Sequence, residues 1–143
     1  MPMKHMPKIR DFMTAQPHSI GKDIALKTAL NMMREYKIRH LPVQEGGKLI
    51  GLLTDRDLKL ASAFQDAVNL TVEEVMTPDP YTVSPDVSFD EVVTTMSNHK
   101  YGCVIVQEMT SKVIGIFTAV DSLRVLGDIL RENYNKEKEV VVN

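Results

Sequence analysis

The chain has 143 residues, of which 43% are hydrophobic and 25% are charged, and its formal net charge is −2. This length allows one compact domain or two very small ones, and the small net charge excludes a general attraction to nucleic acid or to an anionic membrane. The single cysteine excludes an intramolecular disulfide framework. No apolar run approaches the roughly 18 residues of a membrane span, and the N-terminus lacks the apolar core of a signal peptide. We therefore expect a soluble, cytoplasmic protein.

The first half of the chain is predicted to contain the elements β-α-β-β-α. Residues 17–20 (PHSI) form a short extended segment that begins with a proline. A helix is expected over 26–36, because apolar residues recur there at i, i+3 and i+4. Two apolar strands, 40–44 and 49–54, are joined by the turn EGGK, and a second helix begins after Thr54.

The second half of the chain repeats this order. Residues 80–83 (PYTV) are the extended segment, and Ser84-Pro85 is predicted to start the first helix, since a capping residue followed by proline is typical of a helix N-terminus. The strands CVIVQ and VIGIFT are continuously apolar, which indicates burial on both faces. A last helix follows Thr118, and we expect disorder beyond its end, with the terminal VVV able to pair with a partner strand.

An internal repeat explains this parallel. Shifted by 63 positions, Met13-Thr14 falls on Met76-Thr77, and after one inserted residue a shift of 64 places GLLTDRD (51–57) on GIFTAVD (115–121). A register kept this long indicates a tandem repeat of about 60 residues per unit. We therefore divide the chain into unit 1 (8–68), unit 2 (69–130) and a C-terminal helix end with a tail (131–143). Since each unit is too small to bury a large core alone, we expect an α/β (α+β) fold of two β-α-β-β-α motifs packed together.

Both units carry the pattern G-x-x-T-x-x-D where their last strand meets their last helix. Threonine followed three residues later by an acid forms a capping box, and this structural interpretation alone accounts for the two threonine–aspartate pairs. The glycine inside an apolar strand favours a second interpretation, because glycine there indicates the close approach of another group. A helix N-terminus and a threonine hydroxyl suit a phosphate, and a carboxylate can accept from both hydroxyls of a ribose. Capping and ligand binding are compatible, since a carboxylate has lone pairs for both.

With this pattern the chain resembles a pair of CBS domains, the motif named after cystathionine β-synthase. The resemblance is carried by DFMTAQPHSI and IRHLPV…GKLIGLLTDRDL in unit 1, and by EEVMTPDPYTV and CVIV…KVIGIFTAVD in unit 2. It implies a disc-like module in which the two motifs pack sheet against sheet around a pseudo-two-fold axis. Such modules commonly dimerise, commonly bind AMP, ADP, ATP or S-adenosylmethionine, and mostly act as regulatory sensors.

The resemblance also implies two ligand clefts between the units. The Thr118 cleft would be formed by Thr118, Asp121, Thr14, His18, Ile20, Ile38, Arg39, His40 and Pro42. The Thr54 cleft would be formed by Thr54, Arg56, Asp57, Thr77, Tyr81, Val83, Tyr101, Gly102 and Cys103.

The implied roles are parallel in the two clefts. In each, the aspartate would hold the ribose and the threonine would hold a phosphate. Backbone near Ile20 and Ile38 would flank adenine in the Thr118 cleft, whereas Tyr81 or Tyr101 would stack on the base in the Thr54 cleft.

The two units differ where a phosphate needs a cation. Arg39 and His40 would meet the phosphates in the Thr118 cleft, because unit 2 has alanine and valine where unit 1 has Asp55-Arg56. In the Thr54 cleft Arg56 would be the cation, with Gly102-Cys103 in place of Arg39-His40. We therefore expect non-equivalent clefts and assign a multiply phosphorylated ligand to the Thr118 cleft.

Other reactive side chains have simpler interpretations. The four histidines lack the spacing of a zinc site, so we expect no metal. Cys103 lies in an apolar strand and is expected to be a buried, inert thiol. For His40, a phosphate contact and a hydrogen-bonded polar residue at a strand start remain equal alternatives.

The sequence leads to a regulatory ligand-sensing module that binds an adenosine nucleotide as its ligand, with no catalytic cofactor. It would act in trans on an effector protein or through the geometry of a homodimer, which apolar residues Leu123, Leu126 and Leu130 would form across a two-fold axis. One alternative is an assembly module with empty clefts, and another is a binder of S-adenosylmethionine. No set of residues organises a reaction, so we do not expect an enzyme.

Overall fold

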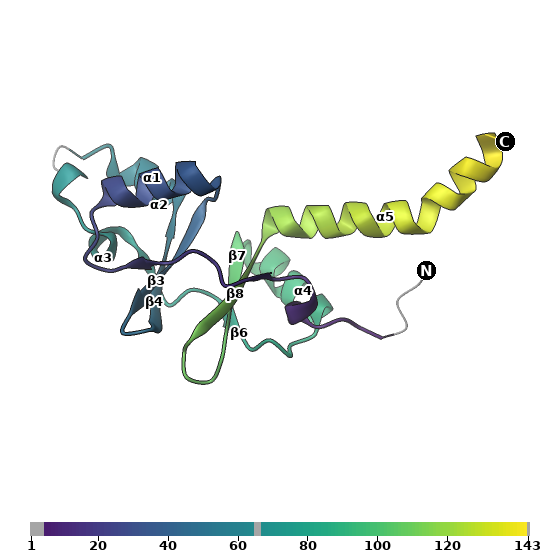
Figure 1. Cartoon of the computed structure of the whole chain (residues 1–143), viewed down its shortest axis with the longest axis horizontal. Helices are drawn as coiled ribbons and strands as arrows, with labels where there is room; N and C mark the ends of the chain where they lie inside the picture. The colour runs from purple at the N-terminus through teal and green to yellow at the C-terminus, as the bar shows by residue number, and fades with distance from the viewer. Residues whose placement is uncertain (1–4, 65–66, 143) are drawn as a thin grey trace.

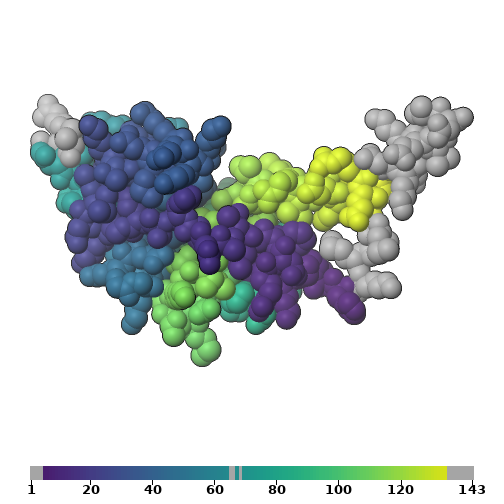
Figure 2. Space-filling model, viewed as in Figure 1, coloured from purple at the N-terminus to yellow at the C-terminus, as the bar shows by residue number. Residues whose placement is uncertain are grey.

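The computed structural model describes residues 5–64 and 67–142, and for 68 and 135–142 it describes the backbone alone. The chain forms two four-stranded sheets, with the strand orders β2-β3-β4-β5 and β1-β8-β7-β6. Figure 1 shows unit 1 with its helices α1 and α2 on one side of the molecule, and unit 2 with α4 on the other. The last helix, α5, extends away from the body of the molecule (Figures 1 and 2).

Each unit has the predicted order β-α-β-β-α. In unit 1 the elements are β2 (Ile20–Gly21), α1 (Leu26–Tyr36), β3 (His40–Glu45), β4 (Lys48–Thr54) and α2 (Asp55–Ala61). In unit 2 they are β6 (Thr82–Val83), α4 (Phe89–His99), β7 (Cys103–Gln107), β8 (Val113–Thr118) and α5 (Ala119–Val142). The mixed α/β class and the two repeated motifs are therefore confirmed.

The apolar strands lie where the sequence predicts. In β7, residues Val104, Ile105 and Val106 are fully buried, as expected for a strand covered on both faces. Each sheet has its own core, completed by a fully buried residue from the first segment of the other unit, Val72 in one core and Ile9 in the other, and a third cluster joins the units. This third cluster packs Cys103, Ile105 and Ile116 of unit 2 against leucines of β4 in unit 1, so the two sheets face each other.

The repeat extends to fine backbone detail. Both sheets have an irregularity at the same place, after Val43 in β3 and after Val106 in β7. The first helix of each unit ends at a lysine in the left-handed region, with φ of 56° at Lys37 and 59° at Lys100. These matched features indicate a pseudo-two-fold relation between the units.

Two short strands that the sequence did not predict connect the units. The segment at the start of unit 1 contains η1 (Ile9–Asp11) and β1 (Thr14–Ala15), and β1 pairs with β8 of unit 2. The segment at the start of unit 2 follows η2 (Ala67–Asn69) and contains α3 (Val72–Val75) and β5 (Thr77–Pro78), and β5 pairs with β4 of unit 1. Each unit therefore lends its first strand to the sheet of the other.

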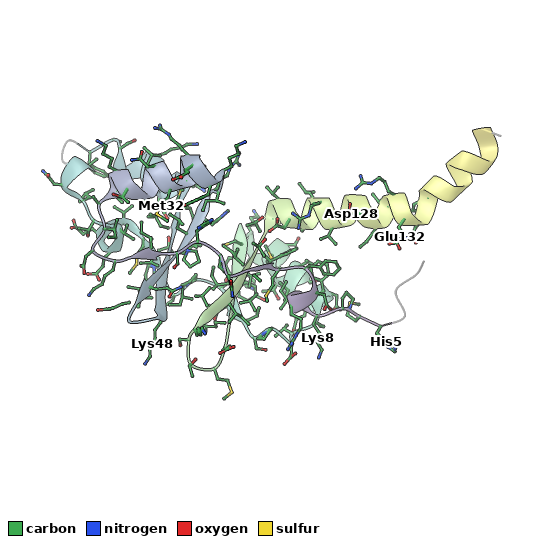
Figure 3. The ribbon with its side chains drawn as sticks, viewed as in Figure 1. His5, Lys8, Met32, Lys48, Asp128 and Glu132 are labelled. Carbon is green, nitrogen blue, oxygen red and sulfur yellow. The ribbon has the colours of Figure 1, made fainter. Side chains whose placement is uncertain are left out.

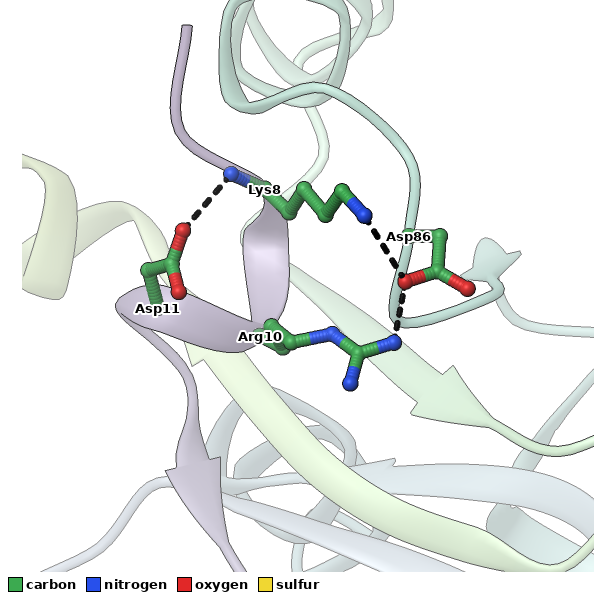
Figure 4. A network of polar contacts seen from close by, with 4 residues as sticks. All are labelled: Lys8, Arg10, Asp11 and Asp86. Atoms are coloured by element: carbon green, nitrogen blue, oxygen red, sulfur yellow. Dashed lines mark hydrogen bonds and ion pairs between the residues drawn. The ribbon is translucent and has the colours of Figure 1, made fainter. Parts of the chain in front are cut away.

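Ion pairs of opposite polarity accompany this exchange. On unit 2, both Lys8 and Arg10 contact the carboxylate of Asp86, and Lys8 Nζ lies 3.4 Å from Asp86 Oδ1 (Figure 4). On unit 1, the roles are reversed, since Lys22 Nζ lies 3.5 Å from Glu73 Oε2 of the incoming segment. Exposed ion pairs add little stability. They disfavour the alternative pairing, however, because on its own unit the basic N-terminal segment would meet Lys22, and the acidic segment with Glu73 would meet Asp86.

Two helix boundaries differ from the sequence prediction. Helix α4 begins at Phe89 and not at Ser84-Pro85, because the carbonyls of Pro85 and Val87 accept hydrogen bonds from the N–H groups of Arg10 and Ile9. At the other end, α5 continues as helix to Val142, where we expected disorder. Asp128 and Glu132 lie on this projecting part of the helix (Figure 3).

Candidate functional site

The two threonine–aspartate pairs are capping boxes. Asp57 N–H donates to Thr54 Oγ1 at 3.1 Å, and Thr54 N–H donates to Asp57 Oδ2 at 2.9 Å. The Thr118 pair with Asp121 has the same two distances. Each box fixes the start of a helix, so the structural interpretation of the motif is confirmed.

The second carboxylate oxygen differs between the boxes. Asp121 Oδ1 accepts from the guanidinium of Arg124 at 2.9 Å. The repeat places Leu60 where Arg124 would be expected, so this pair has no counterpart beside Asp57. One turn further along the helix, Asp121 thus has an arginine partner, whereas Asp57 has a leucine.

The glycine of each motif accommodates a methionine of the exchanged segment. A Cβ atom on Gly115 would overlap the sulfur of Met13 and would lie 2.9 Å from Met13 Cγ. A Cβ atom on Gly51 would lie 3.1 Å from Met76 Cγ and 3.0 Å from the Thr77 carbonyl oxygen. The group that approaches these glycines is thus a part of the chain, which corrects the expectation that the glycines make room for a ligand.

A pocket of about 250 Å³ lies at the Thr54 cleft. Its lining residues are His40, Leu52, Thr54, Thr77, Asp79, Pro80, Tyr81, Tyr101, Gly102 and Cys103. Six of the nine residues that the sequence assigned to this cleft are among them. The pocket combines the end of β4, the exchanged strand β5 and the start of β7, so both units contribute to it.

Three residues predicted for the Thr54 cleft do not line this pocket. Arg56 is exposed on α2, Asp57 is partly buried in its capping box, and Val83 packs against the core of unit 2. Conversely, Asp79 and Pro80 line the pocket although the sequence did not single them out. The internal repeat places Asp79-Pro80 on Gln16-Pro17, and this equivalence was the sequence signal that could have identified them.

Aromatic rings form one wall of the pocket. Tyr81 and Tyr101 stack with centroids 5.2 Å apart, and His99 stacks on Tyr101 at 5.1 Å. In unit 1 the corresponding stack is His18 on Tyr36, at 3.7 Å. A planar base entering the pocket would therefore meet rings that are already held by their neighbours.

His40 lies between the two motifs. It pairs with Thr54 across the β3–β4 ladder, and its Nε2 atom would lie 3.4 Å from a Cβ atom on Gly102. Burial lowers the pKa of His40 below its ordinary value, against opposing effects from Asp55, Asp121 and Asp57. The imidazole is therefore neutral near pH 7, and it lines the Thr54 pocket, although the sequence assigned it to the other cleft as a phosphate contact.

The residues predicted for the Thr118 cleft are partly brought together. Thr14 lies on β1 next to β8, and Ala119 N–H donates to the Gly102 carbonyl at 2.8 Å, so the Thr118 corner faces the start of β7. Arg39 is exposed, and Ile38 packs on the core of unit 1. The side chains of Ile20 and Pro42 are buried, so only their backbone could meet a ligand.

Three further observations concern metal binding, membrane spans and the cysteine. Among the described side chains, no group of three or more histidine, cysteine or acidic residues could hold a metal ion. Within the described ranges 5–64 and 67–142, no helix combines the length and the apolar character needed to cross a membrane. Burial raises the pKa of the Cys103 thiol to about 12, so this cysteine is protonated at neutral pH.

The CBS domain model matches residues 9–63 and 72–128, one copy in each unit. The chain belongs to the CBS domain family. The CBS domain-containing protein YhcV of Bacillus subtilis is 30% identical over 96 residues, which cover 66% of this chain and 69% of that protein. Inosine-5'-monophosphate dehydrogenase of Korarchaeum cryptofilum is 34% identical over 113 residues, 79% of this chain. The matched segment spans only 22% of that enzyme, and 25% of an L-aspartate semialdehyde sulfurtransferase of Methanocaldococcus jannaschii.

Solved CBS structures share the fold. A Vibrio cholerae protein named for acetoin utilization (AcuB) has a TM-score of 0.81 and 31% identity, with 90% of this chain and 98% of that chain covered. The CBS domain pair of protein MJ0100, solved with 5'-methylthioadenosine and S-adenosyl-L-methionine, has a TM-score of 0.77 and 30% identity, with 87% and 98% covered. Both similarities extend over a complete CBS pair.

Proposed function

We propose that this CBS pair is a regulatory sensor that binds an adenosine ligand between its two motifs. The observation that carries the proposal is the pocket of about 250 Å³, which opens between the motifs beside the Thr54 corner. Support comes from the MJ0100 pair, which is 30% identical and was solved with two adenosine compounds.

The geometry suits the sugar and phosphate part of such a ligand. Thr118 pairs with Cys103 at the end of β8, where α5 starts, and the N–H groups of this helix start would bind a phosphate, with the exposed Arg39 as its cation. Asp57 and Asp121 each use one carboxylate oxygen in the cap. The other oxygen of Asp57 can accept from a ribose hydroxyl, and so can Asp121 Oδ1, which has a second lone pair beside the one that accepts from Arg124.

The output is proposed to be a change in a homodimer or in contact with an effector protein. Leu123 and Leu130 on α5 are 67% and 47% exposed, and such large apolar side chains on one helix suit a self-complementary interface. We propose the cytoplasm as the compartment and no catalytic role, since the described residues offer no nucleophile with a base.

Calorimetric titration with AMP, ADP, ATP and S-adenosylmethionine tests this function. The matched variants are Asp57→Asn and Asp121→Asn, because an asparagine oxygen can still accept the cap hydrogen bond while the carboxylate is lost. We expect binding by at least one compound, and at least about tenfold weaker binding in one variant, with little change in thermal stability.

The competing function is an assembly module whose clefts stay empty. In that case none of the four compounds would bind or raise the melting temperature, since only binding to the folded state stabilises it. Nucleotide turnover at saturation would instead indicate an enzyme.

A further inference from the structure

The two clefts differ in charge at positions that the repeat makes equivalent. Around the Thr54 corner the chain places three carboxylates, from Asp55, Asp57 and Asp79, whereas the equivalent positions of the Thr118 corner hold Ala119, Asp121 and Gln16. The Thr54 cleft is therefore the more acidic of the two.

The cations do not offset this difference, because each corner has two of them. Arg39 stands where the Thr54 cleft has Gly102, and Arg124 pairs with Asp121 where the Thr54 cleft has Leu60. The Thr54 side has Arg56 and Lys59, where the repeat has Val120 and Leu123; neither lines the pocket, and Lys59 Nζ lies 3.7 Å from Asp55 Oδ2. An anion is thus repelled from the Thr54 cleft and attracted to the Thr118 cleft.

Asp79 is the carboxylate within the pocket itself. It lines the pocket beside Pro80 and Tyr81, on a backbone with a φ of 51°, which matches the φ of 50° at Gln16 in the other unit. His40 is the one residue in the pocket lining that can become a cation, and it is neutral near pH 7 because burial lowers its pKa. No cation of the lining therefore balances Asp79.

We propose that the Thr54 cleft selects an adenosine-type nucleoside without phosphate, whose 5' substituent is neutral or cationic, and that Asp79 is the residue that rejects phosphates. This inference rests on the proposed function, because it names the ligand class of one of the two clefts. Phosphorylated ligands are then confined to the Thr118 cleft, and the two clefts report on different compounds.

The test compares 5'-methylthioadenosine with AMP and reads the Thr54 cleft by NMR of the Tyr101 ring, which lines it. In the wild type, methylthioadenosine is expected to shift the Tyr101 signal with at least about tenfold higher affinity than AMP. S-adenosylmethionine, whose 5' group is cationic, is also expected to bind at Tyr101 more tightly than AMP, and weaker binding than AMP overturns the inference.

Asp79→Gln imports the residue that unit 1 has at the equivalent turn, so its backbone conformation is compatible with the fold. We expect the affinity ratio of methylthioadenosine to AMP at Tyr101 to fall about tenfold in this variant. The matched control is Gln16→Asp, which leaves the Tyr101 ratio unchanged and weakens AMP binding measured by calorimetry.

The possible failures are distinguishable. AMP binding at Tyr101 as tightly as methylthioadenosine, or an unchanged ratio in Asp79→Gln, overturns the inference and leaves the proposed function intact. Nucleotide binding by calorimetry with no ligand shifting Tyr101 does the same. Absence of binding by every compound in calorimetry and NMR overturns both.

Discussion

Adding one methyl group at Gly115 is expected to destabilise this CBS pair by about 1–3 kcal/mol, the usual cost of overpacking a filled core. The added Cβ would overlap the Met13 sulfur and lie 2.9 Å from Met13 Cγ and 3.2 Å from Met13 Cβ. Met13 precedes the exchanged strand β1, so the strain would act on the contact between the units.

Shortening Met13 identifies this contact as the cause. In the double variant Gly115→Ala with Met13→Ala, only the 3.2 Å approach to Cβ remains, and a shift of a few tenths of an ångström relieves it. Urea unfolding of the wild type, both single variants and the double variant gives the coupling energy between the two positions. We expect the double variant to be about 1–3 kcal/mol more stable than the sum of the two single changes predicts.

Gly51 provides the comparison within the same chain. A Cβ atom at Gly51 meets the Thr77 carbonyl oxygen at 3.0 Å in addition to Met76, and backbone cannot be trimmed by substitution. Rescue of Gly51→Ala by Met76→Ala is therefore expected to be smaller. The reasoning is refuted if Gly115→Ala unfolds at the wild-type urea concentration, or if the Gly115 and Met13 changes are simply additive.

Three other predictions follow from burial and exposure. Burial lowers the pKa of His40 from 6.5, so as the pH falls the unfolded chain takes up this proton before the folded protein does. The contribution of His40 to folding stability is therefore complete above about pH 6.5 and decreases as the pH falls from there towards the folded-state pKa. Between about pH 5 and 8, the melting temperature of His40→Gln should depend less on pH than that of the wild type. Cys103, with a pKa of about 12 and 5% exposure, should react with iodoacetamide far more slowly in the native protein than in urea, and equal rates would show that its strand opens readily. If the proposed dimer forms, glutamate at both Leu123 and Leu130 should convert it to a monomer in sedimentation, while glutamate at the fully exposed Met109 should not. A monomeric wild type, or a dimer that survives the double change, contradicts an interface on this face of α5.

The sequence predicted those features that depend on patterns of several residues. The continuous apolar runs of β7 and β8 are long enough to indicate buried strands, and the threonine–aspartate spacing is sufficient to predict both capping boxes. Local periodicity and capping chemistry are properties of short segments, so one sequence shows them.

The features that it did not predict depend on contacts far apart in the chain. Strands β1 and β5 have two residues each, too few for any periodicity, and they exist only because the other unit supplies a partner. The later start of α4 has the same origin, since Val87 and Pro85 bond to the incoming N-terminal segment. Asp79 was missed because a turn residue before a proline carries no signal of a cavity.

For the two clefts, the resemblance to CBS domains named six of the ten residues that line the Thr54 pocket, because it implies which positions of each motif face a ligand. It placed His40 in the Thr118 cleft alone, whereas the imidazole lines the Thr54 pocket and stands between both motifs. Ligand binding at either cleft stays a prediction until titrated.

The exchange of first strands has a consequence for how this protein can be cut and recombined. A fragment ending between the repeats would carry a strand that belongs to the missing half and would leave the β4 or β8 edge without its neighbour. A bare edge of this kind invites aggregation with other chains. The smallest piece that can be grafted onto another protein as a folded cassette is accordingly the whole pair, and never a single repeat.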